Sequence, residues 1–507
     1  MSLRNRAVIV GVGESDIGRL THMTGLGLNA QAARRAIADA GLKHTQIDGL
    51  LTAYSFTEPY FMLGSVLAEY LGIVPTYGGS IITGGASPTT MLSHAAQAVE
   101  TGMAEVVLVC AGENRATGMS RDEAVGALIA VGHPYFEAPY GVGIPSLYGL
   151  VANAYMAKYG TTRAQMAAVA ANTRGNALKH PNAHMKTPLT VQEVLDSKPI
   201  SDPLNMYDCC LISDAGGAFV VTTPERAKDL PGKPIYLAGI GEAHTHEHLT
   251  SAPSLTEFGA ELSGRKAYDM AGLGPSDIDV AMLYDCFSIV PIIEMEELGL
   301  AERGAGGAFF AEGHAAIGGK LPINTHGGML SHAHAGAVGG LMGIIEAVRQ
   351  LRNEAGDRQT ANATTALVHG EGGILSSHCT ATDIVNFCCL SGDFNGVHAD
   401  HEYCKSTPFG EPIAHAPLVY AIMGGLTYAS GINDGTLLAV LGIDGWRMHG
   451  PVKHGDTLFM RQTVEETREP SKPNRGIVAF KREFVNQRGE AVQSMKATFM
   501  YKRKAAA

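Results

Sequence analysis

The sequence lacks the features that mark a membrane or nucleic-acid-binding protein. No apolar run approaches the ~18 residues that a membrane-spanning helix needs, so we expect no membrane span. No basic cluster is present and the formal net charge is -11, which argues against a nucleic-acid partner. The first six residues lead directly into an apolar, strand-like run, so we also expect no signal peptide.

Cysteine is scarce and forms no recognisable framework. None of the eight cysteines has zinc-ribbon spacing, and the adjacent pairs Cys209/Cys210 and Cys388/Cys389 are poor disulfide partners. Free thiols are typical of a reducing compartment, which predicts a cytoplasmic protein. Glycine is abundant, at 62 residues, and lies in short turns. Such turns are typical of an α/β enzyme with tight strand–helix connections.

The first three quarters of the chain alternate between strand-like and helix-like segments. The apolar run 6–15 is typical of a buried strand, and 26–41 has helical spacing that stops at a glycine. The order of elements restarts at 233–243, where the Gly-x-Gly-Glu of the first strand recurs. We therefore predict two similar halves, 1–230 and 231–380, each with a mostly parallel sheet covered by helices.

The character of the sequence changes after residue 380. Segments 435–469 and 475–503 are typical of long antiparallel strands joined by turns, and one apolar helix precedes them near 417–431. A helix wrapped by such a sheet predicts a separate α+β domain over 381–507.

Five motifs in the first 380 residues occur together and in a characteristic order. They are GGASPTTML (84–92), the segment 200–222, YDCFS (284–288), the segment 324–340 and VHGEGG (368–373). This set resembles the thiolase superfamily, in its sterol-carrier-protein-like branch. The resemblance implies a five-layered α/β fold of two similar halves, a homodimer, and coenzyme A as part of a thioester substrate, with no covalently bound cofactor.

The departures from that family decide the expected chemistry. Gly85 stands where thiolases carry the nucleophilic cysteine, and Gly370 stands where they carry the second, basic cysteine. Tyr284 replaces the usual histidine of the HDCF motif, whereas His334 retains the histidine of the Gly-His-Pro turn with altered neighbours. Ordinary thiolysis is therefore excluded.

The remaining groups favour a different reaction on the same kind of substrate. Backbone donors in glycine turns can stabilise the enolate of a thioester, which is what a retro-aldol cleavage needs. Tyr284 and His334 are the expected acid/base pair. The pattern resembles the thiolase-like aldolases of steroid side-chain breakdown, which implies an OB-fold (DUF35-like) partner protein. The expected substrate-binding residues are Gly85, Ser87, Asn324, His326 and Gly372.

Two other functions and one other kind of site stay open at this point. The thiolase-like part could be an acyltransferase with an unrecognised nucleophile, or a non-catalytic scaffold that binds CoA thioesters or lipids. His326, His332 and His334 could form a metal site, but glycine-rich turns make poor rigid cages, so we expect no metal.

The last domain resembles the MaoC-like hot-dog hydratases. The resemblance rests on Ser391-Gly392-Asp393-x-Asn395 with His398 five residues after the aspartate. It implies that Asp393 and His398 hold one water as base and acid, that Asn395 contacts the substrate, and that the product is an (R)-3-hydroxyacyl-CoA. The alternative is a turn aspartate beside a capping histidine. Segment 372–383 fits both the last thiolase strand and the first hot-dog strand.

Together the two resemblances predict a fused enzyme. The hydratase would make a 3-hydroxyacyl-CoA, and the cysteine-free thiolase-like part would cleave it without an intervening oxidation. We expect a bulky or branched 2-enoyl-CoA, such as one with a steroid side chain, as the substrate.

Overall fold

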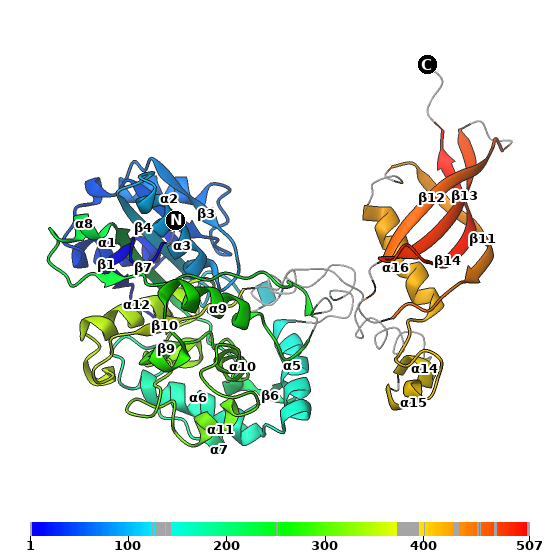
Figure 1. The fold of residues 1–507 in the computed structure, drawn as a ribbon. Coiled ribbons are helices and arrows are strands. Elements are labelled where there is room, and N and C mark those ends of the chain that lie inside the picture. Colours follow the sequence, from blue (N-terminus) through cyan, green and yellow to red (C-terminus); the bar gives the residue numbers. More distant parts are fainter. Residues whose placement is uncertain are drawn as a thin grey trace. The chain divides into compact units, whose positions relative to one another are not determined.

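The computed structural model divides the chain into two compact units (Figure 1), Met1–Leu249 with Ser254–Leu375, and Thr250–Pro253 with Ser376–Ala507. The domain boundaries predicted at residues 230 and 380 stay predictions. The structure describes residues 3–120, 122–123, 126, 137, 143–249, 252, 254–372, 395–399, 401–429, 433, 435–453, 456, 458–470 and 474–503.

A six-stranded sheet organises the first unit, in the order β3-β2-β4-β7-β1-β8. β2 runs parallel to β3 and β4, whereas β7 runs antiparallel to β4 and β1, so the sheet is mixed rather than mostly parallel. The apolar pattern of a buried strand is the same in either direction, and it therefore does not predict strand direction. The strands are β1 (Val8–Glu14), β2 (Gly49–Ala53), β3 (Tyr77–Ile81), β4 (Val106–Asn114), β7 (Asp214–Thr222) and β8 (Ile235–Tyr236).

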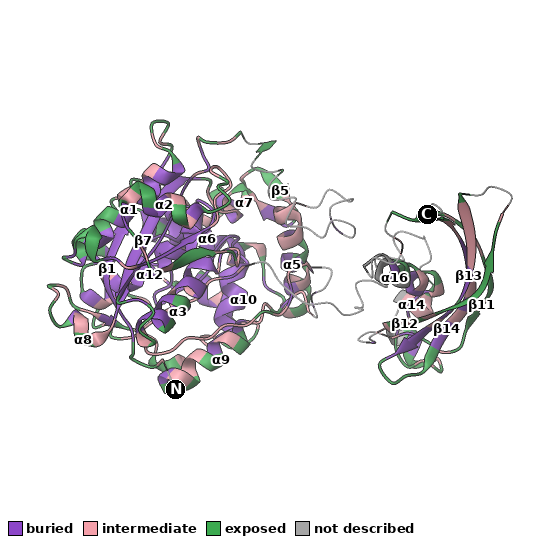
Figure 2. Ribbon diagram, turned by 90° about the horizontal axis from the view of Figure 1, so that it is seen from above, coloured by how far each residue is buried: buried purple, intermediate pink, exposed green. Residues whose placement is uncertain are grey.

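Both faces of this sheet are covered by helices. Val8 and Val10 pack against α1 (Gly25–Asp39) and α2 (Leu63–Leu71), whereas Ile9 belongs to the cluster with α3 and α12 on the other face. Successive strand residues point to opposite faces, which is why one strand serves both clusters. Figure 2 shows the strands and the helices between the layers as largely buried. The two inner helices are α3 (Ser87–Glu100) and α12 (Val338–Arg352).

The second half of this unit supplies two further layers. β9 (Val280–Met282) and β10 (Ala366–Val368) pair in parallel, and Val280 and Met282 pack against Ala347 of α12. The opposite side of β9 joins a cluster with α6 (Arg163–Ala177) and α10 (Val290–Glu297), which completes five layers and confirms the predicted fold. The expected strand at 233–243 is reduced to β8, which pairs with β1 of the first half.

The remaining helices and strands of the first unit surround these layers. They are α5 (Ile144–Tyr159), α6 (Arg163–Ala177), α7 (Val191–Leu195), β5 (Pro199–Ser201), β6 (Leu204–Asn205), α8 (Pro224–Ala227), α9 (Ala260–Ala271), α10 (Val290–Glu297) and α11 (Gly306–Ala311).

The second unit is a helix packed on an antiparallel sheet, as predicted for a hot-dog domain. Its strands follow the order β11-β14-β13-β12, with α16 (Ala416–Ala429) against one face. Leu418 and Val419 of α16 pack with Phe484, Val492 and Met495 of the sheet. The other elements are α14 (Gly396–Ala399), α15 (His401–Lys405), β11 (Leu437–Met448), β12 (Leu458–Arg468), β13 (Arg475–Asn486) and β14 (Ala491–Lys502).

Candidate active site

The turn between β3 and α3 brings Gly85 to the start of a buried helix. Ser87 Oγ accepts a hydrogen bond from the backbone N–H of Thr83 (3.0 Å) and donates one to the carbonyl oxygen of Gly84 (2.7 Å). Gly84 has a φ of 57°, a conformation that glycine adopts without strain. Ser87 was predicted to bind substrate, but it is fully buried and its hydroxyl shapes this turn.

Tyr284 occupies the space that a side chain at position 85 would need. A Cβ atom built on Gly85 would lie 2.1 Å from the phenol oxygen of Tyr284 and 2.4 Å from the carbonyl oxygen of Glu371. A Cβ atom on Gly372 would lie 1.8 Å from the carbonyl oxygen of Thr83. The two glycine turns therefore pack backbone to backbone, and a phenol stands where thiolases carry their thiol.

Tyr284 lies two residues after the end of β9 and is held there by its backbone. Its N–H donates to Glu294 Oε2 (2.8 Å), and the amide of Asn324 pairs with both the N–H and the carbonyl of Leu283. Asn324, predicted to bind substrate, is thus engaged in presenting Tyr284. Burial, together with the nearby Cys286 thiol, raises the pKa of Tyr284 well above 10, so the phenol stays protonated and donates hydrogen bonds.

A carboxyl group that sequence analysis missed lies on the second glycine turn. Glu371 is 7% exposed and accepts a hydrogen bond from the phenol of Tyr148 (2.8 Å). Burial, and then the charge of Glu294, raise the pKa of Glu371 to about 8. Its position directly after Gly370, where thiolases carry their second cysteine, is the sequence feature that could have identified it.

A buried ion pair lies next to Glu371. The Nδ1 atom of His369 is 3.0 Å from a carboxylate oxygen of Glu294. Burial lowers the pKa of His369, but the Glu294 carboxylate outweighs it, so the net shift is upward. The Glu294 carboxylate disfavours ionisation of Glu371, and the positive charge of His369 offsets part of this effect.

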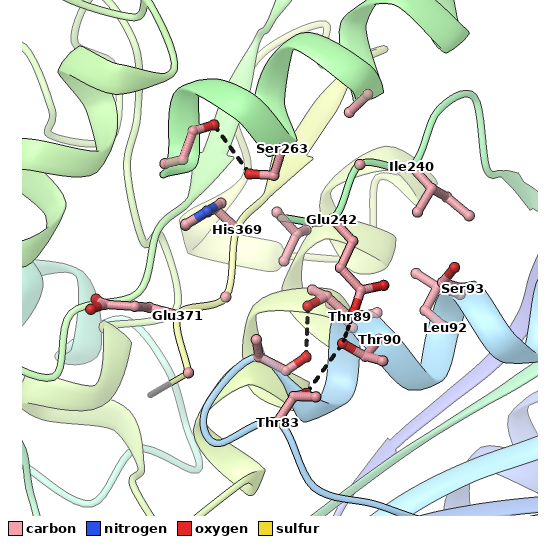
Figure 3. Close-up of a pocket in the computed structure, with 18 of the residues that line it drawn as sticks. Thr83, Thr89, Thr90, Leu92, Ser93, Ile240, Glu242, Ser263, His369 and Glu371 are labelled. Carbon is pink, nitrogen blue, oxygen red and sulfur yellow. Dashed lines mark hydrogen bonds between the residues drawn. The ribbon is translucent and has the colours of Figure 1, made fainter. Parts of the chain in front are cut away.

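A cavity reaches this group from one side. It encloses about 780 Å³ between α3 and α9 and is lined by residues of both helices, of 235–247 and of 366–372. Figure 3 shows Glu371 and His369 on one side of the cavity and Thr90 and Glu242 on the other. Gly85 and Tyr284 are not part of its lining, so the cavity adjoins the candidate site without enclosing it.

The Nε2 atom of His334 is a hydrogen-bond acceptor. Its Nδ1 lies 3.0 Å from the carbonyl oxygen of Leu211, which can only accept, so Nδ1 carries the hydrogen and Nε2 has the lone pair. Burial, and then the charge of Arg115, lower the pKa of His334 to about 4. At neutral pH the ring is therefore neutral and can accept a proton or a hydrogen bond, but it cannot donate from Nε2.

His326, predicted to bind substrate, lies in a separate buried network. Its ring meets that of His332 edge-on, with centroids 5.3 Å apart. His332 and His180 in turn place their Nε2 atoms 3.7 and 3.6 Å from the two carboxylate oxygens of Glu14.

The group of Glu14, His180 and His332 does not fit a metal. Nδ1 of His180 accepts a hydrogen bond from the backbone N–H of Asn182 (3.1 Å), so its Nε2 carries the hydrogen and offers no lone pair. The carboxylate of Glu14 is also paired with Arg349. Of the three histidines considered as ligands, His334 bonds to Leu211 instead of joining this group.

Glu14 is expected to be a major contributor to the stability of the first unit. Burial raises its pKa, but the nearby His180 and His332 rings and the charge of Arg349 outweigh burial and hold the pKa well below the usual value of 4.5. Glu14→Gln should lower the free energy of unfolding by about 3 kcal/mol at pH 7, because it leaves the Arg349 guanidinium without its counter-charge.

The pH dependence checks this expectation. A carboxyl with a lowered folded-state pKa stabilises the fold above its unfolded-state pKa and loses this effect as the pH falls. Urea unfolding of the two proteins should therefore differ most near neutrality and converge towards pH 3. Glu312→Gln, at an exposed site, is the control and should not differ from the parent. An equal difference at both pH values would contradict the assignment.

The second unit presents His398 with a defined tautomer. Its Nδ1 lies 2.7 Å from the carbonyl oxygen of Ile413, so Nδ1–H donates and Nε2 has the lone pair. The ring stacks on His415 with centroids 3.6 Å apart. Asn395 is exposed and caps the short helix α14 through a 3.3 Å hydrogen bond from the N–H of Val397. Asp393 lies outside the described residues, so its pairing with His398 stays a prediction.

Comparison with known proteins identifies two families along the chain. Residues 241–382 match the thiolase C-terminal domain-like family, and residues 364–482 match the MaoC-like domain family. The two matches overlap over 364–382, the region that contains β10 and Glu371. The structure pairs β10 with β9 of the first unit. Among the helices of the described ranges, none is long and apolar enough to cross a membrane.

Two curated relatives and one solved structure cover the first unit. An acetyl-CoA acetyltransferase of Methanothermobacter thermautotrophicus is 32% identical over 72% of this chain and 96% of its own length. A 17-hydroxy-3-oxo-4-pregnene-20-carboxyl-CoA lyase of Mycobacterium tuberculosis is 34% identical over 69% and 92%. The Ltp2-ChsH2(DUF35) aldolase structure is 33% identical, covers 74% of this chain and 97% of that one, and superposes with a TM-score of 0.65. The chain therefore belongs to the thiolase superfamily, as a member that carries a C-terminal MaoC-like domain.

Proposed function

We propose that the protein is a two-step lyase of acyl-CoA metabolism. The MaoC-like unit hydrates a 2-enoyl-CoA to a 3-hydroxyacyl-CoA, and the thiolase-like unit cleaves that product by a retro-aldol reaction. The contact between Gly85 and Tyr284 carries the proposal, because it replaces the nucleophile of a thiolase by a neutral phenol. The lyase and aldolase relatives support it.

The cleavage balances without an oxidant or free CoA. The β-hydroxyl loses its proton, the Cα–Cβ bond breaks, and a ketone or aldehyde leaves while the thioester holds the enolate. Cα then takes up a proton, which gives a shorter acyl-CoA. The phenol of Tyr284 and the N–H groups of the two glycine turns stabilise the enolate oxygen, and Nε2 of His334 can accept a hydrogen bond from the bound substrate.

The test supplies a branched 3-hydroxyacyl-CoA to the purified protein without free CoA. We expect a carbonyl compound and a shorter acyl-CoA in equal amounts by mass spectrometry. The same protein given the matching 2-enoyl-CoA should pass through the hydroxy intermediate to the same two products. Formation of the enoyl-CoA alone would restrict the chemistry to the MaoC-like unit and leave the larger unit a scaffold.

The acetyltransferase relative favours acyl transfer as a second candidate. That reaction needs a nucleophile, and burial followed by the charge of Glu371 raises the pKa of the nearby Cys286 thiol well above 9, which makes it a poor one. Incubation with radiolabelled acyl-CoA decides between the candidates. A covalent acyl-enzyme supports transfer, and its absence together with cleavage supports the lyase.

The acyl group of the substrate is bulky or branched, and the relative named for a pregnene carboxyl-CoA indicates a steroid side chain as the first compound to test. A panel of 3-hydroxyacyl-CoA thioesters, from straight-chain to steroid, compares kcat/KM directly.

The expected partners follow from exposed features of the first unit. β3 is an edge strand whose middle residues Gly78–Ser80 are exposed, and Ile82 directly after it exposes a large apolar side chain. An edge of this kind is completed by a second copy, which supports a homodimer. The DUF35-containing aldolase structure supports an OB-fold partner. The free thiols of the described cysteines fit the predicted cytoplasmic location.

A further inference from the structure

We propose that Glu371 is the proton carrier of the cleavage. Its carboxylate accepts the proton of the β-hydroxyl group, and the resulting carboxylic acid returns that proton to Cα of the enolate. This inference rests on the proposed retro-aldol function and adds a catalytic residue to it.

Glu371 is placed for this role by the two glycine turns. Its own carbonyl oxygen would lie 2.4 Å from a Cβ atom on Gly85, so its backbone touches the position where thiolases carry their nucleophile. Figure 3 shows its side chain directed away from Glu242 at the far side of the cavity. The carboxyl accepts the hydrogen bond of the Tyr148 phenol there.

The two carboxylate oxygens of Glu371 have different environments. Oε1 accepts the hydrogen bond of Tyr148, whose ring is fixed by stacking on Phe287 with centroids 4.5 Å apart. Oε2 is buried and has no hydrogen-bond partner within the part of the chain that the structure describes. A buried carboxylate oxygen is rarely left without a partner, and an incoming substrate hydroxyl would supply one.

One carboxyl group is sufficient for the whole proton balance. The retro-aldol step removes one proton from oxygen and adds one proton to carbon, so the carrier ends the cycle as it began. The phenol of Tyr284 stays protonated throughout and acts only as a hydrogen-bond donor. The raised pKa of Glu371, about 8, suits a group that must both take and give a proton near neutral pH.

Tyr148, Glu294 and His369 are positioning residues in this arrangement. Tyr148 orients the carboxyl of Glu371, Glu294 raises its proton affinity through a nearby negative charge, and His369 holds Glu294 in place. Tyr148→Phe should therefore shift the pH dependence of cleavage and lower kcat less than removal of the carboxyl does.

The experiment compares the parent with Glu371→Gln and Glu371→Asp, using a branched 3-hydroxyacyl-CoA. We expect the glutamine variant to lose at least about 100-fold in kcat, and the aspartate variant to retain a part of it. The parent kcat should rise with pH through about 8, because the carboxylate is the active form, and the residual activity of the glutamine variant should lack this inflection. Cleavage by the glutamine variant within threefold of the parent would overturn the inference.

A second measurement separates this inference from the proposed function. The parent incubated in D2O with the shorter acyl-CoA alone should exchange its Cα hydrogens for deuterium, and the glutamine variant should not. If the parent fails to cleave but exchanges deuterium through Glu371, the retro-aldol proposal fails, whereas the proton transfer between Glu371 and Cα stands. If both proteins exchange equally, the carrier role fails whatever the parent cleaves.

Thermal unfolding of the same variants tests whether a loss of cleavage comes from a loss of the fold. A carboxyl with a raised folded-state pKa destabilises the fold as the pH rises above its unfolded-state value, so Glu371→Gln should raise Tm by a few degrees at pH 8. The exposed Glu312→Gln should leave Tm unchanged. A lower Tm for the glutamine variant would show that its loss of cleavage comes from the fold, and would overturn the assignment.

Discussion

Tyr284→Phe is expected to reduce the cleavage of a 3-hydroxyacyl-CoA by about 100- to 1000-fold while hydration by the same chain stays unchanged. The phenol is buried, protonated and placed where thiolases carry their thiol, so its loss removes a preorganised donor to the enolate oxygen. The ring remains in contact with Gly85, so the fold should be retained. Both half-reactions are measured separately, with the 3-hydroxyacyl-CoA for cleavage and the 2-enoyl-CoA for hydration.

The matched control acts in the other unit. His398→Ala should reduce hydration by about 100-fold or more and leave cleavage intact. The substitution removes the imidazole whose Nε2 keeps its lone pair because Nδ1–H donates to the Ile413 carbonyl. If each variant loses only one of the two activities, each reaction is assigned to one unit. Equal cleavage by the parent and Tyr284→Phe would remove Tyr284 from the mechanism, and loss of both activities in either variant would indicate that the units do not work independently.

Gly85→Ala is expected to abolish cleavage and to destabilise the first unit by about 3 kcal/mol. The new Cβ atom would lie 2.1 Å from the phenol oxygen of Tyr284 and 2.4 Å from the carbonyl oxygen of Glu371, and the backbone partner cannot move aside cheaply. Overpacking of this kind costs about 1–3 kcal/mol, more where backbone must shift. Thermal unfolding and cleavage of the 3-hydroxyacyl-CoA measure the two effects.

The contact itself can be tested by relieving it. Gly85→Ala combined with Tyr284→Ala should recover part of the stability that Gly85→Ala loses, because the phenol no longer occupies the space, but it should not recover cleavage. Gly175→Ala, at an open position on the surface of α6, is the control and should unfold like the parent. A Gly85→Ala protein as stable and active as the parent would show that the space at this turn is not closed.

The sequence by itself determined the family and the missing chemistry, and the resemblance carried by its ordered motifs implied the five layers. Apolar periodicity records which elements are buried but not the direction of a buried strand, which is why the expected mostly parallel sheet is a mixed one. The absence of a cysteine at Gly85 is a property of the sequence alone, and it is enough to exclude thiolysis. The proposal of a hydratase followed from the short motif that ends at His398, whose partner Asp393 stays a prediction.

The tertiary structure alone decided which side chains meet at the candidate site. Glu371 lies in the motif VHGEGG (368–373), but the motif alone does not identify it as a candidate. Its burial beside Tyr148 and Glu294 depends on segments more than 70 residues away. Asn324 and His326 are close neighbours in sequence, yet one holds the strand that presents Tyr284 and the other enters the network of Glu14. Such assignments depend on which surfaces pack together, and neither composition nor spacing within one segment records the neighbours that another segment supplies.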